Sequence, residues 1–261
     1  MINQELYEQL CADVLPIFRS IPGAGRYAIT LGGSHGKGLS DQRSDFDFRV
    51  YYDASVEGSA WDGIWNDLNR SIAKWKAQGV EIDGVWSRSI GDVDKELEGW
   101  LTGKGSAVPY VWTVWGYHFL TDIYNQAIIE DPFGVVQGWK DRMKTYPDTL
   151  RDAILKKHGD SLRYWRADYH YYNKCVRRDH VFMASITTRL MHDVMQVVYA
   201  LNRFYYPGDG HNLAFTQSFP LKPEGLEERA VKILYPGNTP DCLDRQYWDM
   251  VALIDDVLKL V

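Results

Sequence analysis

The residues with the clearest chemical potential lie between positions 33 and 47. Gly33 and Ser34 follow one predicted strand, and two aspartates, Asp45 and Asp47, begin the next one. Side chains two residues apart on a strand point to the same face, so both carboxylates can share one hard cation, for which Mg²⁺ is the natural candidate. Glycine lets backbone N–H groups approach phosphate oxygens, and the Ser34 hydroxyl adds a donor. The pattern predicts a metal ion beside a bound phosphate.

A third carboxylate comes from the next predicted strand, over residues 80–86. Glu81 and Asp83 lie two residues apart there, so they share one face, opposite the apolar side chains of Val80 and Ile82. On geometry alone, either acid could complete the site.

Two glycine motifs that bind nucleotides in other proteins are excluded. A Walker A loop would need glycine at position 31 and serine or threonine at position 38, where this chain has Leu31 and Gly38. Residues 23–28 match the spacing of a dinucleotide-binding motif, but they follow a predicted helix and precede a predicted strand, which reverses the order that the motif requires. The loop over residues 32–44 is therefore neither a P-loop nor a Rossmann turn.

The glycine turn and the aspartate pair together resemble the signature of a known superfamily. Gly33 and Ser34, followed about ten residues later by Ser44 and an Asp-x-Asp pair at 45–47, resemble the motif of the DNA polymerase β-like nucleotidyltransferases. The spacing is most similar to that of the antibiotic nucleotidyltransferases that adenylylate aminoglycosides and lincosamides, which also have a helical second domain. The resemblance covers roughly residues 20 to 135, and beyond them only the architecture is similar.

This resemblance implies roles for the site residues. It implies that Asp45 and Asp47 are catalytic Mg²⁺ ligands for a bound nucleoside triphosphate, ATP or another. It implies that Gly33 and Ser34 hold the phosphates of this co-substrate, and it places Ser44 among the nucleotide-binding residues. It also implies a third carboxylate, acting as a metal ligand or as a base.

The third acid and the basic groups are assigned from the same resemblance and from charge. The pattern hydrophobic, acid, hydrophobic at 80–82 favours Glu81 as the third catalytic acid, ahead of Asp83, which remains a candidate metal ligand. Lys37 could reach a phosphate or face water. Lys174, in a basic stretch with Arg177, could face the triphosphate from the second domain, and a solvated helix end is the alternative.

These residues need a sheet to position them, and the hydrophobic periodicity predicts one. Strands are expected at 27–31, 46–52 and 80–86, with helices at the N-terminus and at 61–75, while residues 110–129 could form a helix or a strand. From residue 138 onward the pattern is helical. The expected fold is α/β (α+β): a nucleotidyltransferase-type mixed β-sheet domain flanked by helices, residues 1–135, followed by a C-terminal helical bundle domain, residues 136–261.

Composition limits the partners and the compartment. The net charge of -6 argues against a broad nucleic-acid surface, and no stretch approaches the roughly 20 apolar residues that a membrane helix needs. The first residues lack the basic start and apolar run of a secretory signal. The three cysteines, Cys11, Cys175 and Cys242, suggest neither a disulfide framework nor a zinc site, so a cytoplasmic protein is expected.

The predicted reaction follows from the motif. We expect Mg²⁺-dependent transfer of a nucleoside monophosphate, AMP from ATP, to a hydroxyl of a small molecule, such as an aminoglycoside or lincosamide antibiotic, which would confer resistance. Residues 1–139 contain 19 acidic and 11 basic side chains, which favours a cationic acceptor. The alternatives are a nucleotidyltransferase that modifies a protein or a tRNA, and a nucleotide-binding module without catalysis.

Overall fold

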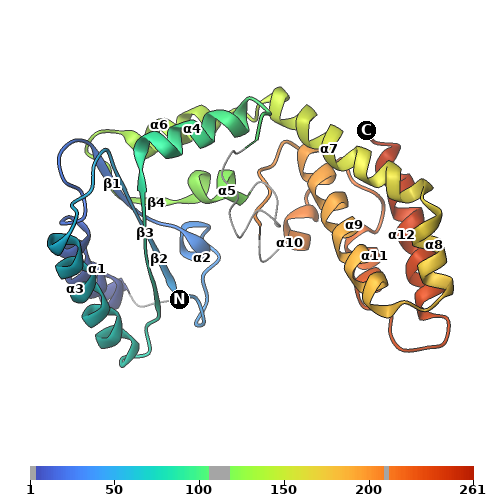
Figure 1. Ribbon diagram of the computed structural model, residues 1–261, viewed down its shortest axis with the longest axis horizontal. Coiled ribbons are helices and arrows are strands. Elements are labelled where there is room, and N and C mark those ends of the chain that lie inside the picture. Colours follow the sequence, from blue (N-terminus) through green and yellow to red (C-terminus); the bar gives the residue numbers. More distant parts are fainter. Residues whose placement is uncertain (1–3, 106–117, 209–211) are drawn as a thin grey trace. The chain divides into compact units, whose positions relative to one another are not determined.

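The computed structural model of the chain describes residues 4–105, 118–208 and 212–261 (Figure 1). Among these residues it is a mixed α/β (α+β) protein with twelve helices and one four-stranded sheet. The elements follow one another along the chain as α1 (Gln4–Phe18), β1 (Tyr27–Leu31), α2 (Gly33–Gly36), β2 (Phe46–Tyr52), α3 (Ser59–Lys76), β3 (Ile82–Ser89), α4 (Ile90–Leu101), α5 (His118–Asn125), β4 (Ala127–Glu130), α6 (Val135–Met143), α7 (Asp148–Ala167), α8 (Tyr169–Val176), α9 (His180–Leu201), α10 (Asn212–Thr216), α11 (Leu226–Leu234) and α12 (Cys242–Leu258).

The sheet is mixed, with strand order β3-β2-β1-β4. β1 and β2 are antiparallel and pair from Tyr27↔Tyr52 to Leu31↔Phe48. β3 runs parallel to β2, because α3 carries the chain back between them, and β4 is antiparallel to β1. The polar loop with the predicted chemistry connects β1 to β2, so Gly33 and Ser34 follow one central strand, in α2, and Asp47 lies on the adjacent one.

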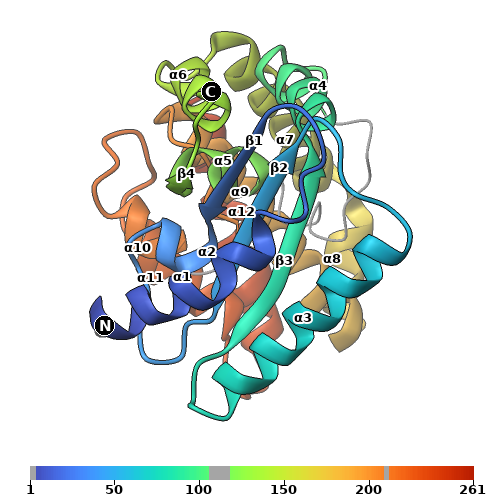
Figure 2. The same ribbon diagram turned by 90° about the vertical axis from the view of Figure 1, so that its left-hand side faces the viewer.

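Helices α1 and α3 cover one face of this sheet (Figure 2). The buried residues of α1 recur every four positions, at Leu10, Val14 and Phe18, which forms one apolar stripe. They pack against the alternate residues of β2, of which Phe46 and Phe48 are fully buried. The odd-numbered residues of β2 therefore project from the opposite face, away from this core.

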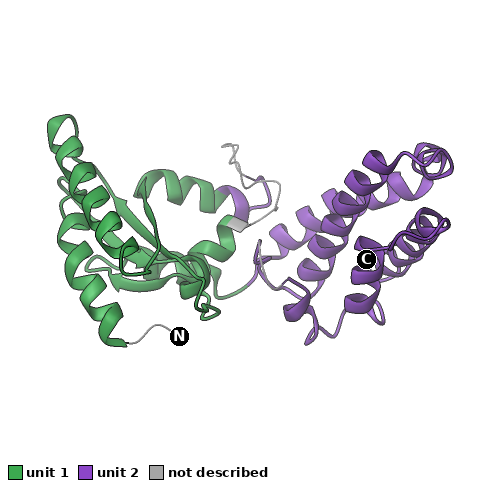
Figure 3. Cartoon of the chain, turned by 90° about the horizontal axis from the view of Figure 1, so that it is seen from below, with its two compact units in different colours: residues 1–98, 119–145 green, residues 99–118, 146–261 purple. Residues whose placement is uncertain are grey.

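The chain divides into two compact units, shown in different colours in Figure 3. Unit 1 contains residues 1–98 and 119–145, and unit 2 contains residues 99–118 and 146–261. The expected boundary lay after residue 135, whereas α6 belongs to unit 1. Trp139 of α6 explains this, because its ring packs edge-on against Tyr51 of β2 with a centroid separation of 4.9 Å, and its Nε1 donates to Asp94 at 2.7 Å.

The described residues of unit 2 form helices and the loops between them, with no strand. α9 packs against α7 and α12, and its central turns are buried almost all round, from Leu190 to Ala200. The helical stretch expected from residue 138 onward is interrupted after α7, because the Asp168 side chain accepts a hydrogen bond from the His170 N–H at 2.7 Å and caps a new helix, α8. No helix in the described ranges is both long and apolar enough to cross a membrane.

Candidate metal centre

β2 and the turn before it position the first two carboxylates. Asp47 is the second residue of β2, and Asp45 immediately precedes the strand. Phe46 lies between them and is buried in the core on the α1 and α3 side. Because side chains alternate along a strand, burying Phe46 turns both aspartates to the other face. The burial of Phe46 therefore produces the shared face of Asp45 and Asp47 that the Asp-x-Asp spacing predicts.

β3 brings a third carboxylate to the same face through an irregularity in the strand pairing. Phe46 pairs with Ile82, whereas Phe48 pairs with Val85, so two residues of β3, Asp83 and Gly84, lie opposite the single residue Asp47. Gly84 has a φ of +83°, a value that glycine adopts without strain. Such a bulge commonly re-aims a side chain at a functional site.

The three aspartates form a carboxylate cluster that has the composition of a metal site. One ligand oxygen from each of Asp45, Asp47 and Asp83 lies within 4.8 Å of the other two. Asp45 and Asp47 are half-buried and Asp83 is exposed, so the cluster opens to solvent on the β3 side. Carboxylate oxygens are hard ligands, which suit Mg²⁺ or Ca²⁺ better than the softer metals that prefer sulfur or imidazole.

The glycine turn packs directly on this cluster. Gly33 has a φ of +56°, and a Cβ atom placed there would lie 1.7 Å from Asp47 Oδ2. The preceding residue, Gly32, donates its N–H to the Asp47 carbonyl at 2.8 Å. Any side chain at position 33 would therefore displace the Asp47 carboxylate. Gly33 is required because backbone and carboxylate occupy adjoining space, and the two halves of the sequence motif meet here.

Ser34 follows this turn and carries a polar atom without a partner. Its Oγ is buried and makes no hydrogen bond to any described residue. A buried hydroxyl in this state costs stability unless a ligand or water satisfies it. Ser34 thus has a hydroxyl without a partner in the described chain, next to Gly33, which packs against Asp47.

A buried arginine lies behind the carboxylate cluster. The Arg49 guanidinium is 11% exposed, with Nη2 3.6 Å from Asp47 Oδ1 and Nε 3.4 Å from Asp122 Oδ2. Burial raises the pKa of Asp47 to about 6, Arg49 opposes this shift, and the charges of Asp45, Asp122 and Asp83 reinforce it. Three neighbouring acids thus disfavour the charge on Asp47 and Arg49 favours it, a balance that a divalent ion would shift toward the charged form.

A buried polar network holds Asp122 in place. Gln126 Nε2 donates to Asp122 Oδ2 at 3.1 Å, and Gln126 Oε1 accepts from Thr30 at 2.7 Å and from the Tyr51 hydroxyl at 3.0 Å. Sequence reasoning missed Arg49, Asp122 and this network. Arg49 carried a signal, since it continues the alternation of positions 45 and 47, whereas Asp122 and Gln126 lay in a stretch whose secondary structure was ambiguous.

Glu81, the favoured third acid, lies apart from the cluster of three aspartates. It comes one residue before β3, and its carboxylate pairs with Lys76 of α3 at 2.9 Å. The expected common face with Asp83 requires both residues to be in the strand, and only Asp83 is. The cluster found among the described residues contains Asp83 and not Glu81.

The other predicted nucleotide-binding residues have different surroundings. Ser44 shapes the turn before β2, because its Oγ accepts from the Asp41 N–H at 2.9 Å and donates to Asp41 Oδ1 at 3.2 Å. Lys37 follows α2 and is half-buried. Lys174 belongs to unit 2, where its Nζ lies 2.9 Å from Asp179 Oδ2 and over the ring of Phe182.

The fold and the site define a mixed α/β protein with a solvent-accessible carboxylate cluster, and comparison adds one family match. Residues 112–210 are similar to a family described as a domain of unknown function, DUF4037. This stretch, under half of the chain, contains Asp122 and Lys174 but none of the three clustered aspartates. No curated protein matches the chain. What the protein does must therefore follow from the chemistry of its own side chains.

Proposed function

We propose that this protein is a Mg²⁺-dependent nucleotidyltransferase with a nucleotidyltransferase-type sheet domain, which transfers AMP from ATP to a hydroxyl of a small molecule. One observation carries the proposal: ligand atoms of Asp45, Asp47 and Asp83 gather within 4.8 Å of one another, and Gly33 packs against Asp47. This donor set fits Mg²⁺, which typically takes a few carboxylates from the protein and completes its coordination with phosphate oxygens and water. The motif at 33–47 supplies two of the carboxylates, Asp45 and Asp47, and a hydroxyl, that of Ser34, for the phosphate.

In the proposed transfer, each residue of the site would have its own role. Asp45 and Asp47 would hold Mg²⁺, which when bound neutralises charge on the transferring phosphate and on departing pyrophosphate. Ser34 would donate its unpartnered hydroxyl to a phosphate oxygen. Arg49 would keep the Asp47 carboxylate oriented from behind. Asp83, the exposed member of the cluster, would take the proton of the acceptor hydroxyl as its oxygen bonds to the α-phosphorus and the bond to pyrophosphate breaks.

The acceptor is proposed to be a small cation. The excess of acidic over basic side chains in residues 1–139 supports this, since an acidic surface attracts cationic molecules and repels nucleic acid. Aminoglycosides and lincosamides combine amino groups with several hydroxyls and are the first acceptors to test. An enzyme of this kind, placed in the cytoplasm, would inactivate such antibiotics.

A labelled-nucleotide assay tests the proposal. The full-length protein is incubated with each α-phosphate-labelled nucleoside triphosphate, with Mg²⁺ or with EDTA, and with aminoglycosides, lincosamides or cell extract. We expect Mg²⁺-dependent transfer of label from ATP to one acceptor, with pyrophosphate released in equal amount. If the label appears on protein or RNA of the extract instead, the acceptor is a macromolecule and not a small molecule.

Paired variants make the assay specific for the cluster. Asp47→Asn and Asp83→Asn should each lower transfer by about a hundredfold or more, the usual cost of losing one group that stabilises the transition state. Glu81→Gln is the matched control, because it removes a neighbouring carboxylate that pairs with Lys76, and it should retain activity within about threefold. Wild-type rates in Asp47→Asn, or binding of ATP without release of pyrophosphate, would contradict the proposal.

A further inference from the structure

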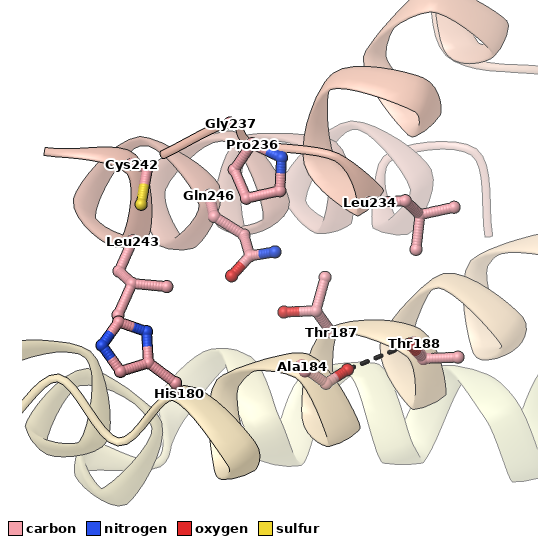
Figure 4. Close-up of a pocket in the computed structure, with 10 residues that line it drawn as sticks. All are labelled: His180, Ala184, Thr187, Thr188, Leu234, Pro236, Gly237, Cys242, Leu243 and Gln246. Carbon is pink, nitrogen blue, oxygen red and sulfur yellow. Dashed lines mark hydrogen bonds between the residues drawn. The ribbon is translucent and has the colours of Figure 1, made fainter. Parts of the chain in front are cut away.

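Unit 2 contains a pocket that is independent of the carboxylate cluster. It has a volume of about 260 Å³ and lies between the first turns of α9 and α12, beside the turn that follows α11 (Figure 4). Three of its side chains, Thr187, Leu243 and Gln246, are buried and form the floor, whereas His180 and Thr188 are exposed at the rim. The remaining lining residues are Ala184, Leu234, Pro236, Gly237 and Cys242.

The orientation of the Gln246 amide is determined by its surroundings. Its Nε2 donates to the Ile233 carbonyl at 2.8 Å. A carbonyl can only accept, so the NH₂ group must face Ile233 and the amide oxygen must face the other way. That oxygen, Oε1, is buried and has no hydrogen-bond partner among the described residues, although the whole side chain is only 5% exposed. Gln246 therefore presents an unsatisfied acceptor to the pocket.

Thr187 supplies a second unsatisfied group from the opposite helix. Its side chain is 1% exposed, and its Oγ1 makes no hydrogen bond within the described chain. The fully buried Tyr171 hydroxyl, which also has no partner at hydrogen-bond distance in the described chain, lies close enough for hydrogen bonding by Thr187 to counteract the rise that burial causes in the pKa of Tyr171. When the Tyr171 O–H turns toward Thr187 Oγ1, the Thr187 O–H remains available to donate into the pocket. Figure 4 shows the polar ends of Gln246 and Thr187 extending into the same space from α12 and α9. An acceptor and a hydroxyl that can donate thus converge there.

The walls of the pocket limit the charge of what can bind. None of its ten described lining residues is Lys, Arg, Asp or Glu, and the side chains of Leu234, Pro236 and Leu243 are apolar. A charged group would lose its hydration at this floor without meeting an opposite charge, which costs far more than a hydrogen bond returns. Water alone could pair with both polar groups, but it would gain nothing from the apolar walls.

We propose that this pocket binds a small neutral molecule with an amide-type edge, an N–H donor next to a carbonyl or ring-nitrogen acceptor. The N–H would donate to Gln246 Oε1, and the adjacent acceptor would receive the Thr187 hydroxyl. The rest of the molecule would lie against Leu234, Pro236 and Leu243. Lactams and the neutral edges of nucleobases have this chemistry, and the pocket volume suits a single ring.

A pair of matched probes tests this assignment. δ-Valerolactam is neutral and carries an N–H beside a carbonyl, and N-methyl-δ-valerolactam has the same ring without the donor. Binding to the full-length protein is measured by NMR titration, followed through the methyl groups of Leu234, Leu243 and Thr188. We expect saturable shifts with the lactam, and an affinity for the N-methyl compound that is lower by about tenfold or more, because it leaves the buried Gln246 oxygen unpaired.

Two adjacent threonines provide the matched variants. Thr187→Val keeps the shape of the side chain but removes the hydroxyl, and it should weaken lactam binding by about five- to tenfold. Thr188→Val is the control, since the exposed Thr188 hydroxyl already donates to the Ala184 carbonyl at 2.9 Å, and its affinity should be unchanged. Both variants should retain the wild-type NMR spectrum away from the pocket.

Three outcomes would overturn the proposal. The first is equal affinity for the two probes, and the second is equal loss of affinity in the two threonine variants. The third is no saturable shift of the pocket methyl groups at the solubility limit of the lactam, which would mean that the pocket holds water only. None of these results depends on nucleotidyl transfer, so the pocket and the proposed activity can fail separately.

Discussion

Replacing Asp47 by asparagine should stabilise the metal-free protein at neutral pH and remove its response to Mg²⁺. Burial and the nearby acids raise the pKa of Asp47 from 3.8 to about 6. A difference of roughly two pKa units corresponds to about 3 kcal/mol that the folded state loses by keeping this group ionised, at 1.36 kcal/mol per unit. The side chain is only 19% exposed, so solvent screens little of this cost. Because the amide must also find partners, we expect a net gain of about 1–3 kcal/mol.

The pH dependence of this gain has a definite sign. The folded protein holds the Asp47 proton more tightly than the unfolded chain does, so wild-type stability falls as pH rises from about 4 to about 6 and loses no more from this group above that range. Asp47→Asn lacks this loss. The two proteins should therefore be about equally stable below pH 4, and the variant should be more stable by the full amount at about pH 7.

Hydrogen exchange isolates the effect in unit 1. The urea dependence of exchange in peptides from β1 and β2, with EDTA present, reports the unfolding free energy there without a contribution from the helices of unit 2. Asp53→Asn is the control of opposite sign, because the hydrogen bonds of Asp53 to Arg26 lower its pKa, so removing that carboxylate should destabilise the protein. Added Mg²⁺ should stabilise the wild type and the control but not Asp47→Asn. Finding Asp47→Asn no more stable than the wild type in EDTA, or equally stabilised by Mg²⁺, would refute the reasoning.

Three further predictions concern the groups around Asp47. Gly33→Ala should abolish Mg²⁺ binding in calorimetric titrations, because its methyl would lie 1.7 Å from Asp47 Oδ2. Gly38→Ala is the control: Gly38 has a similar φ of +68° with no atom within 4 Å of a Cβ there, so the variant should only lose about 1–2 kcal/mol of stability. Arg49→Met should destabilise the β2 region by about 3–5 kcal/mol in hydrogen exchange, because it leaves the buried Asp122 carboxylate without its cation. A change under about 1 kcal/mol would mean that Arg49 does not hold the site together. Mg²⁺ affinity should rise about tenfold per pH unit up to about pH 6 and then level off, and a flat profile over that range would show that Asp47 is not a ligand.

The central strands of the sheet could be predicted from the sequence. The expected ranges 27–31 and 46–52 are those of β1 and β2, because each strand is short, alternating and bounded by glycine or polar turn residues. The alternation also predicted that Asp45 and Asp47 share a face, and the burial of Phe46 confirms it. By contrast, α4 was not predicted, although its buried Ile90, Val93 and Leu97 recur at helical spacing, and α2 lies within a stretch that was expected to be loop throughout.

The rest of the site depends on interactions that no local pattern encodes. Whether Glu81 or Asp83 joins the aspartate pair is decided by where β3 begins and by the bulge opposite Asp47. An alternation rule treats both acids alike and cannot locate either feature. The contact between Arg49 and Asp122 joins residues 73 positions apart, on β2 and α5, so it is a property of the tertiary fold. Sequence reasoning thus reaches the ligands on one strand and misses the groups that orient them.

The surroundings of Asp47 indicate why the cluster should need a cation. The carboxylates of Asp45, Asp83 and Asp122 add to the effect of burial in raising the pKa of Asp47, and Arg49 opposes this rise. If the metal-free protein only had to be stable, one of these acids would be better replaced by a neutral side chain. Position 33 would then not have to be a glycine that leaves room for Asp47 Oδ2. Keeping this repulsion is favourable only if a divalent ion relieves it. Binding of the metal should therefore stabilise unit 1 as a direct consequence of the same charges that would serve the proposed transfer.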